Sequence, residues 1–318
     1  SMPVALSPVG LTGMQHADGE IHAARAAEKF GVPFTLSTLS ICSIEDVAAA
    51  TSKPFWFQVY TLKDDDFMTR LMERARKANC SAIVITLDLQ VQGQRHKDLK
   101  NGLSAPPKLT LRSIADMMTK VSWGLGMLGT KRRTFGNVVG HAEGVTNPSS
   151  LSSWTAEAFD HALDWDRVKE LMDMWGGKVV LKGIMDPEDA RRAADLGADA
   201  IVVSNHGGRQ LDGALSAIRM LPDIIEAVGD RMEVYFDSGI RSGQDILKAL
   251  ALGADGVMIG RSWVYGLGAM GEAGVTKALE VLHKELDTTM ALCGHRDIKQ
   301  VDRDILRIPA NFRGEWAD

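Results

Sequence analysis

The sequence has 318 residues, of which 45% are hydrophobic and 24% charged, the composition of a globular protein that can bury a full core. Its formal net charge is -5 without long runs of one sign, which argues against a nucleic-acid-binding surface, and three isolated cysteines argue against a disulfide framework or a zinc site. No apolar stretch reaches the length of a membrane span and no signal peptide opens the chain, so we expect a cytoplasmic protein and leave peripheral association with the inner membrane open.

Short apolar runs alternate along the chain with longer amphipathic stretches. Eight of these runs have the length and composition of β-strands: 3–7, 33–37, 56–60, 82–88, 179–182, 200–204, 234–237 and 256–260. Helical periodicity fills the intervals, as in 22–30, 66–78 and 187–196. Strands that alternate with helices indicate a parallel sheet, and eight is the number that closes a barrel. The sequence therefore predicts an α/β fold, a (β/α)8 TIM barrel.

One connection is much longer than the others. Residues 91–175 separate the fourth strand from the fifth and include Pro106 and Pro107, a basic run at 131–133 and a stretch rich in Gly, Asn and Ser at 136–153. A helix that begins near Asp164 should lead into the fifth strand. Connections of this length in a compact domain are usually lids. We predict a single domain over 1–318, with a lid insertion at 91–175.

Every predicted strand ends near at least one polar side chain. These are Ser7, Ser37, Gln58 with Tyr60, Thr86 with Asp88, Lys182, Ser204 with His206, Asp237, and Arg261. In a parallel barrel the C-terminal ends of the strands form one rim, which is where active sites lie. A single polar residue at a strand end can simply mark where the strand stops. Eight such positions with varied ionisable chemistry favour a shared site.

Two glycine-containing segments follow the last two strands, FDSGIRSGQD at 236–245 and LGADGVMIGRS at 252–262. Glycine lets backbone N–H groups approach an anion closely, and a following helix N-terminus adds partial positive charge. Arg241 and Arg261 add charged donors. Gly253 fits a tight turn alone, but the pair of segments predicts a phosphate site. The G-x-G-x-x-G fingerprint of dinucleotide binding is missing, so a mononucleotide is favoured.

The segment SNHGGRQLD at 204–212 places His206 three residues before Arg209. Such a pair offers a proton acceptor beside a guanidinium group that binds carboxylates. Asp88 would hold the imidazole in one tautomer, and Arg95 would supply a second guanidinium group for the same carboxylate.

Lys182 stands in the apolar segment VVLKGI, where a buried ammonium group is costly unless it has charged partners or a catalytic role. It would either stabilise a cofactor that becomes anionic on reduction or, with a lowered pKa, form a Schiff base with a carbonyl substrate. A surface lysine whose stem is covered by apolar neighbours is the structural alternative.

The segments TLSTLSICSIEDVA, WFQVY, LKGI, SNHGGRQLDG and DSGIRSGQDILKALALGADGVMIGR stand in order along the chain. Through them, from Met2 to about Ile305, the sequence resembles the FMN-dependent L-2-hydroxy acid dehydrogenases and oxidases, and the opening MPVALSPVGLTGM looks most like the bacterial L-lactate dehydrogenase branch. The resemblance implies that FMN is the cofactor and that an L-2-hydroxy acid such as L-lactate is oxidised to the 2-oxo acid. The electrons would pass to a quinone, a cytochrome or oxygen.

The resemblance also implies individual roles. The FMN contacts would come from Pro8, Val9, Gly10, Ser37, Gln58, Thr86, Lys182, Ser204, Asp237, Gly239, Arg241, Gly260 and Arg261. Lys182 would lie near N1 and the C2 oxygen of the flavin, which favours its flavin role over a Schiff base. On the substrate side, His206 would be the base, Asp88 its partner, Tyr60 a hydrogen-bond donor, and Arg95 with Arg209 the carboxylate clamp. No metal is implied.

The sequence departs from the family pattern in two places. Members usually carry a helical segment before the first strand, including a tyrosine that contacts the substrate carboxylate, whereas this chain starts at the strand. We therefore expect either a truncated or engineered form, or a substrate that is held by one fewer contact and binds more weakly. Leu39 stands where glycolate-type members have tryptophan, which leaves room for lactate or a bulkier 2-hydroxy acid.

Two other classes of function stay open at this point. One is a Schiff-base aldolase that uses Lys182, and the other is a catalytically impaired FMN-binding protein. The expected partners are a small 2-hydroxy acid and an electron acceptor, without nucleic acid, and association into a homo-oligomer stays open.

Overall fold

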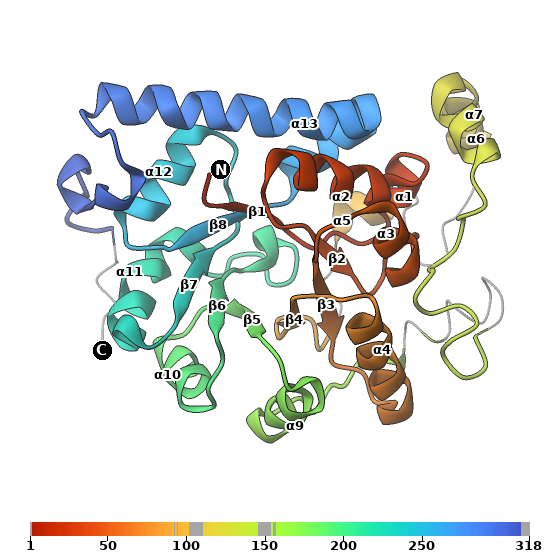
Figure 1. The fold of residues 1–318 in the computed structure, drawn as a ribbon, viewed down its shortest axis with the longest axis horizontal. Coiled ribbons are helices and arrows are strands. Elements are labelled where there is room, and N and C mark those ends of the chain that lie inside the picture. The colour runs from red at the N-terminus through yellow and green to blue at the C-terminus, as the bar shows by residue number, and fades with distance from the viewer. Residues whose placement is uncertain are drawn as a thin grey trace.

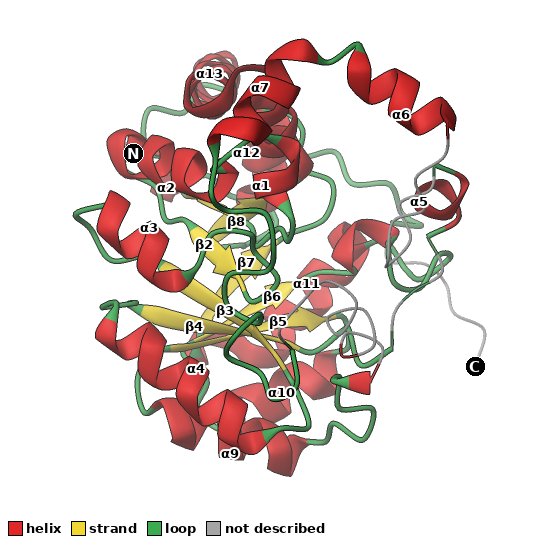
Figure 2. Cartoon of the chain, turned by 90° about the vertical axis from the view of Figure 1, so that its right-hand side faces the viewer, coloured by secondary structure: helices red, strands yellow, loops and turns green. Residues whose placement is uncertain are grey.

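The eight strands form one parallel sheet that curls into a barrel surrounded by helices (Figures 1 and 2). The computed structural model describes residues 2–91, 93, 95–101, 111–145, 154 and 157–312. The strand order is β1-β8-β7-β6-β5-β4-β3-β2. A parallel bridge between Leu6 and Phe34 brings the two outer strands together. The predicted TIM barrel is confirmed.

The strands are β1 (Val4–Leu6), β2 (Thr35–Ser37), β3 (Trp56–Tyr60), β4 (Ala82–Thr86), β5 (Val179–Ile184), β6 (Ala200–Val203), β7 (Glu233–Phe236) and β8 (Gly256–Ile259). Most are a residue or two shorter than predicted. The prediction that Lys182 ends its strand is wrong, because β5 continues to Ile184. Gly183 has a φ of 106°, and this residue shifts the register so that Ile184 still pairs with Val203.

The α-helices are α1 (Thr12–Gln15), α2 (Gly19–Phe30), α3 (Ile44–Ala50), α4 (Asp65–Lys77), α5 (His96–Lys100), α6 (Leu111–Met118), α7 (Val121–Gly129), α9 (Trp165–Trp175), α10 (Pro187–Asp195), α11 (Ala217–Val228), α12 (Gly243–Ala251) and α13 (Arg261–Leu292). The predicted helices at 22–30, 66–78 and 187–196 are confirmed within a few residues, as is the start near Asp164. Asp64, Asp164 and Asp186 cap their helices by accepting backbone N–H groups of the first turn.

Side chains alternate along each strand between the barrel interior and the helices. The apolar residues that fill the lower interior are Ala5, Val84, Val180, Ala200, Val202 and Met258, with Trp56 and Tyr235 packed against them. Outward residues such as Phe57, Ile83 and Ile85 join the larger core beneath the helices. The interior is therefore closed by apolar side chains, and the polar ends of the strands lie above this layer.

The long connection between β4 and α9 contains α5, α6 and α7, and Figure 1 shows α6 and α7 at the outer edge of the molecule. Trp123 of α7 donates from Nε1 to the carbonyl oxygen of Met14 at 2.9 Å. Arg132 pairs with Asp18 at 3.0 Å and with Asp46 at 2.8 Å, so the connection is fastened to the barrel behind α7. Pro106, Pro107 and residues 146–153 of the stretch rich in Gly, Asn and Ser lie outside the described residues. The role of the connection as a lid stays a prediction.

Candidate active site

A ring of six polar residues and Gly260 lies one step above the apolar interior layer. Each member follows an interior residue by two positions, which the alternation of a strand places on the same face. The pairs run from Ala5 to Ser7, Trp56 to Gln58, Val84 to Thr86, Val180 to Lys182, Val202 to Ser204, Tyr235 to Asp237 and Met258 to Gly260. The barrel therefore gathers at one rim the strand-end residues that the sequence singled out.

On one side of the rim, hydroxyl and amide groups form a row across β2, β3 and β4. Ser37 Oγ donates to Gln58 Oε1 at 3.0 Å, and Gln58 Nε2 donates to Thr86 Oγ1 at 3.0 Å. All three side chains are buried. Such a row of fixed donors and acceptors suits the polar edge of a heteroaromatic ring.

On the opposite side, Lys182 forms an ion pair that is almost completely buried. Its Nζ lies 3.0 Å from Asp237 Oδ2 and donates to Ser204 Oγ at 3.1 Å. Burial by itself lowers the pKa of Lys182, but the carboxylates of Asp237 and Asp88 raise it above its usual value. Lys182 therefore stays protonated and presents a fixed positive charge to the rim. A lysine that forms a Schiff base needs a pKa below its usual value instead.

His206 and Asp88 meet across the rim, as the sequence predicted. His206 Nδ1 lies 2.9 Å from Asp88 Oδ1, and both side chains are mostly buried. Burial favours a higher pKa for Asp88, yet the hydrogen bond with His206 and the charge of Lys182 hold the pKa below its usual value. The ionised carboxylate keeps a proton on Nδ1, so the neutral imidazole presents Nε2 as a proton acceptor.

The backbone around His206 is held in a strained turn. His206 has a φ of 57°, a region that side-chain-bearing residues seldom occupy. Its N–H donates to Ser204 Oγ at 3.1 Å, while Ser238 Oγ accepts from the N–H groups of Asn205 and Gly207 at 3.2 and 3.0 Å. These bonds fix the direction in which the imidazole leaves the backbone.

Gly183, which the sequence analysis did not single out, shapes the place of Asp88. A Cβ added at Gly183 would lie 2.8 Å from Asp88 Cγ, closer than real Cβ contacts. Gly183 also has a positive φ, which glycine adopts more easily than other residues. The only sequence signal was a glycine directly after Lys182 in the LKGI segment.

Tyr60 extends from the end of β3 and packs edge-on against Phe159, with ring centroids 5.4 Å apart. Burial and the negative charge of Asp88 raise the pKa of Tyr60, so the phenol stays neutral and can donate a hydrogen bond. Its role as a donor to the substrate stays a prediction.

The loops that carry the two predicted clamp arginines are packed against each other. Arg95 Nη2 donates to Gln210 Oε1 at 3.1 Å, next to the exposed Arg209. A Cβ at Gly93 would lie 2.5 Å from the carbonyl oxygen of Arg209, so the two backbones touch. Convergence of the two guanidinium groups on one carboxylate stays a prediction.

The glycine-containing loops after β7 and β8 are the segments that the sequence predicts to bind a phosphate. Gly239 has a φ of 116°, and Gly260 is the N-cap of α13. The guanidinium groups of Arg241 and Arg261 are exposed, and neither makes a hydrogen bond or ion pair within the described part of the chain. Arg261 reaches back towards η1 (His206–Gly208), because a Cβ at Gly207 would lie 2.9 Å from Arg261 Nη2. This donor set is suited to a phosphate dianion.

The loop after β1 completes the rim. Pro8, Val9 and Gly10 are partly exposed, and Leu11 N–H donates to the carbonyl oxygen of Leu39 at 3.0 Å. Beneath them lies the buried carboxylate of Glu20, which accepts backbone N–H groups from Gly13, Ile41 and Cys42 at 3.0, 3.0 and 3.3 Å. The sequence analysis missed Glu20, since a glutamate at the start of a helix is ordinarily exposed.

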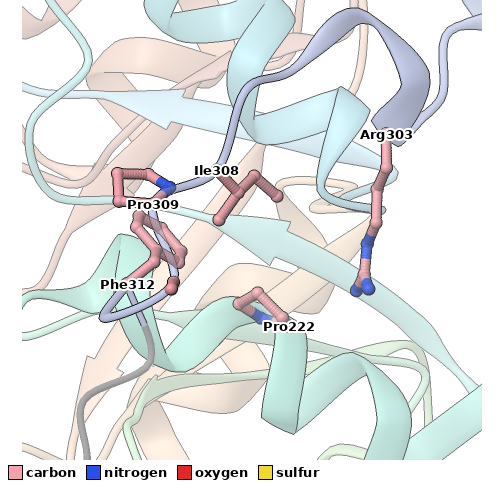
Figure 3. A pocket seen from close by; sticks show the side chains of 6 residues that line it. Pro222, Arg303, Ile308, Pro309 and Phe312 are labelled. Carbon is pink, nitrogen blue, oxygen red and sulfur yellow. The ribbon is translucent and has the colours of Figure 1, made fainter.

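A pocket of about 220 Å³ lies elsewhere, between α11 and the C-terminal segment (Figure 3). It is lined by Pro222, Arg303, Ile308, Pro309, Ala310 and Phe312. None of these residues belongs to the polar rim, and none brings the chemistry of His206 and Lys182.

Residues 1–308 match the model of the FMN-dependent dehydrogenases. The chain belongs to this family. It is 48% identical over 315 residues to the L-lactate dehydrogenase of Caulobacter vibrioides strain NA1000, covering 97% of this chain and 81% of that protein. It is 47% identical over 308 residues to the L-lactate dehydrogenase of Pseudomonas aeruginosa strain LESB58, covering 96% and 80%.

Solved structures of the same fold are similar over most of this FMN-dependent dehydrogenase. The crystal structure of the monotopic membrane protein (S)-mandelate dehydrogenase has a TM-score of 0.91 and 36% identity, covering 96% of this chain and 81% of that one. Mandelate oxidase with (S)-2-phenylpropionate has a TM-score of 0.75 and 39% identity, covering 93% and 75%.

FMN is the cofactor of this oxidoreductase, as the sequence predicted, and the rim fits it. The row from Ser37 to Thr86 suits the ring edge, Lys182 supplies a positive charge beside it, and two unpaired guanidinium groups with Gly239 and Gly260 suit the phosphate. The assignment of individual contacts to FMN stays a prediction.

Proposed function

We propose that the protein oxidises an L-2-hydroxy acid, in the first place L-lactate, to the corresponding 2-oxo acid. The observation that carries the proposal is the pairing of His206 with Asp88 at 2.9 Å, on the rim that also holds Lys182. A base, a fixed cation and two arginines at one rim suit a substrate that has both a carboxylate and a hydroxyl group to oxidise. The named relatives, L-lactate dehydrogenases, support lactate within this class.

In this mechanism, FMN would accept two electrons when it is bound. Arg95 and Arg209 bind the substrate carboxylate, and Tyr60 donates a hydrogen bond to the substrate. His206 accepts a proton from the substrate at Nε2, and Asp88 stabilises the resulting imidazolium through Nδ1. The protonated Lys182 stabilises negative charge at the rim. A quinone, a cytochrome or oxygen would be the final electron acceptor.

Anaerobic addition of L-lactate to the purified yellow protein should bleach the flavin absorbance near ~450 nm, because oxidised flavin loses that band when it takes up two electrons. A panel of glycolate, L-lactate, 2-hydroxybutyrate and (S)-mandelate would rank substrates by the rate of bleaching. D-lactate is the matched control, since it differs only in configuration. A protein that holds FMN but is bleached by none of these acids would be a cofactor binder without this activity.

A Schiff-base aldolase is disfavoured by the charge of Lys182. The ammonium group is held by Asp237 and Ser204, and the two nearby carboxylates raise its pKa rather than lower it. An amine nucleophile must be neutral when it attacks a carbonyl carbon.

We also propose that α6 and α7 dock the protein on a membrane surface. Six large hydrophobic side chains on these helices are exposed, at spacings that place each set on one helix face: Leu111, Ile114 and Met118, then Val121, Leu125 and Leu128. Within the described ranges no helix is both long and apolar enough to cross a membrane. The similar (S)-mandelate dehydrogenase is a monotopic membrane protein, which supports docking on one face. A membrane-bound quinone is then the favoured acceptor.

The docking proposal predicts that the protein floats with phospholipid vesicles in a density gradient. Replacing Leu125 and Leu128 together by Glu should abolish flotation, because burying the two carboxylates would oppose insertion. Leu292→Glu, at the exposed end of α13, is the matched control and should still float. Flotation of the double variant as strong as that of the wild type would contradict the docking proposal.

A further inference from the structure

Gln210 uses every hydrogen-bonding group of its amide to join two loops of the rim. Its Nε2 donates to the carbonyl oxygens of Asp88 at 3.0 Å and Val91 at 2.9 Å, while its Oε1 accepts from Arg95 Nη2 at 3.1 Å. Gln210 follows Arg209 directly, in the loop after β6. The other three residues belong to the loop after β4.

The two loops hold the groups that the proposed reaction needs. The loop after β4 carries Asp88 and Arg95, and the loop after β6 carries His206 and Arg209. Their backbones touch at Gly93, where a Cβ would lie 2.6 Å from the carbonyl oxygen of Gln210. One amide therefore ties the Arg95 guanidinium group to the loop that carries the base.

Glutamine suits this position because its amide offers two N–H donors and one carbonyl acceptor on a single plane. Glutamate would keep the acceptor for Arg95 but would place a carboxylate against two carbonyl oxygens. Methionine has similar length and volume and would remove all three bonds. Arg95 would then lose the hydrogen bond that restricts its rotamers on the side of Gln210.

We propose that Gln210 is a positioning residue for the substrate carboxylate, which acts by holding Arg95 in the orientation that pairs with it. This inference rests on the proposed function, in which Arg95 binds that carboxylate. Gln210 itself need not touch the substrate. Its contribution should therefore appear in binding of the carboxylate and should disappear when Arg95 is absent.

The test is a double-mutant cycle on the FMN-loaded protein with Gln210→Met, Arg95→Met and the double variant. Two quantities are measured: KM and kcat for L-lactate, and the dissociation constant of oxalate from its perturbation of the flavin spectrum. Oxalate is a small dicarboxylate without a hydrogen to be removed, so its binding reports the carboxylate contacts without turnover. We expect Gln210→Met to raise KM and the oxalate dissociation constant about tenfold and to change kcat less. A tenfold effect is in the range measured for the coupling of residues in contact.

In the double variant, Gln210→Met should weaken oxalate binding by less than about twofold beyond the effect of Arg95→Met alone. Gln210→Glu keeps an acceptor for Arg95, so its oxalate constant should lie closer to the wild-type value than that of Gln210→Met. FMN content and thermal unfolding of each variant show whether the fold is kept. If Gln210→Met does not fold, Gln210→Ala, which also removes the acceptor for Arg95, supplies the same cycle with Arg95→Met.

Different results overturn the inference in distinguishable ways. In one case, the effects of Gln210→Met and Arg95→Met on the oxalate constant multiply in the double variant. In another, Arg95→Met raises the oxalate constant but Gln210→Met leaves it unchanged. Either result would show that Gln210 does not act through Arg95. Binding of oxalate and lactate unaffected by Arg95→Met would remove both the proposed carboxylate role of Arg95 and the inference built on it. Equal losses of kcat and FMN content without a change in oxalate binding would indicate a structural role.

Discussion

His206→Gln is expected to bind FMN like the wild type and to lose about 10²–10⁴-fold in the rate at which L-lactate reduces the flavin, the usual contribution of a general base. Glutamine has similar size, but its amide cannot accept a proton at neutral pH. The carboxylate of Asp88, 2.9 Å from Nδ1 in the wild type, would then have no imidazolium to stabilise. Anaerobic stopped-flow mixing with L-lactate measures this rate directly.

His283→Gln is the matched control for this substitution. His283 lies on α13 at the surface, where its ring packs edge-on against Phe30 with centroids 6.0 Å apart. L-lactate should reduce the flavin of His283→Gln at the wild-type rate. Normal reduction in His206→Gln would refute the role of His206 as the base.

Lys182→Met should lower the free energy of unfolding by about 3–5 kcal/mol, the usual cost of removing one partner from a buried ion pair. Lys182 is only 3% exposed, and its loss would leave the carboxylate of Asp237 without a cationic partner. Only neutral donors would remain to it, the hydroxyl groups of Ser204 and Ser7 and the backbone N–H of Ser238. Urea unfolding of the apoprotein, followed by tryptophan fluorescence, measures the change without a contribution from lost FMN contacts.

Lys169→Met supplies the comparison for Lys182→Met. Lys169 pairs with Asp173 on the exposed surface of α9, and such pairs contribute less than about 1 kcal/mol. A loss in Lys182→Met no larger than that in Lys169→Met would mean that the buried ion pair does not stabilise the fold as inferred here.

The fold could be predicted because its main signals are local. Apolar runs such as 82–86 and 200–203 are long enough for a strand and too short for a helix, and turn residues separate them from helices with clear periodicity. The residues at which strands end were predicted less accurately, as the continuation of β5 beyond Lys182 shows. Propensity does not reveal that Gly183 adopts a φ of 106° and lets the pairing resume at Ile184.

The sequence by itself determined the barrel and the residues of its rim, because a parallel barrel brings all C-terminal strand ends to one face and the period of two carries each polar side chain inward. The sequence named Asp88 as the partner of His206, but only the tertiary structure gave the 2.9 Å distance between them. It alone also showed the fit of Gly183 against Asp88, the burial of Glu20 and the bridge made by Gln210, which join segments that are far apart in the sequence. Their distances depend on how the loops pack, and local patterns of hydrophobicity and turn residues do not contain that information.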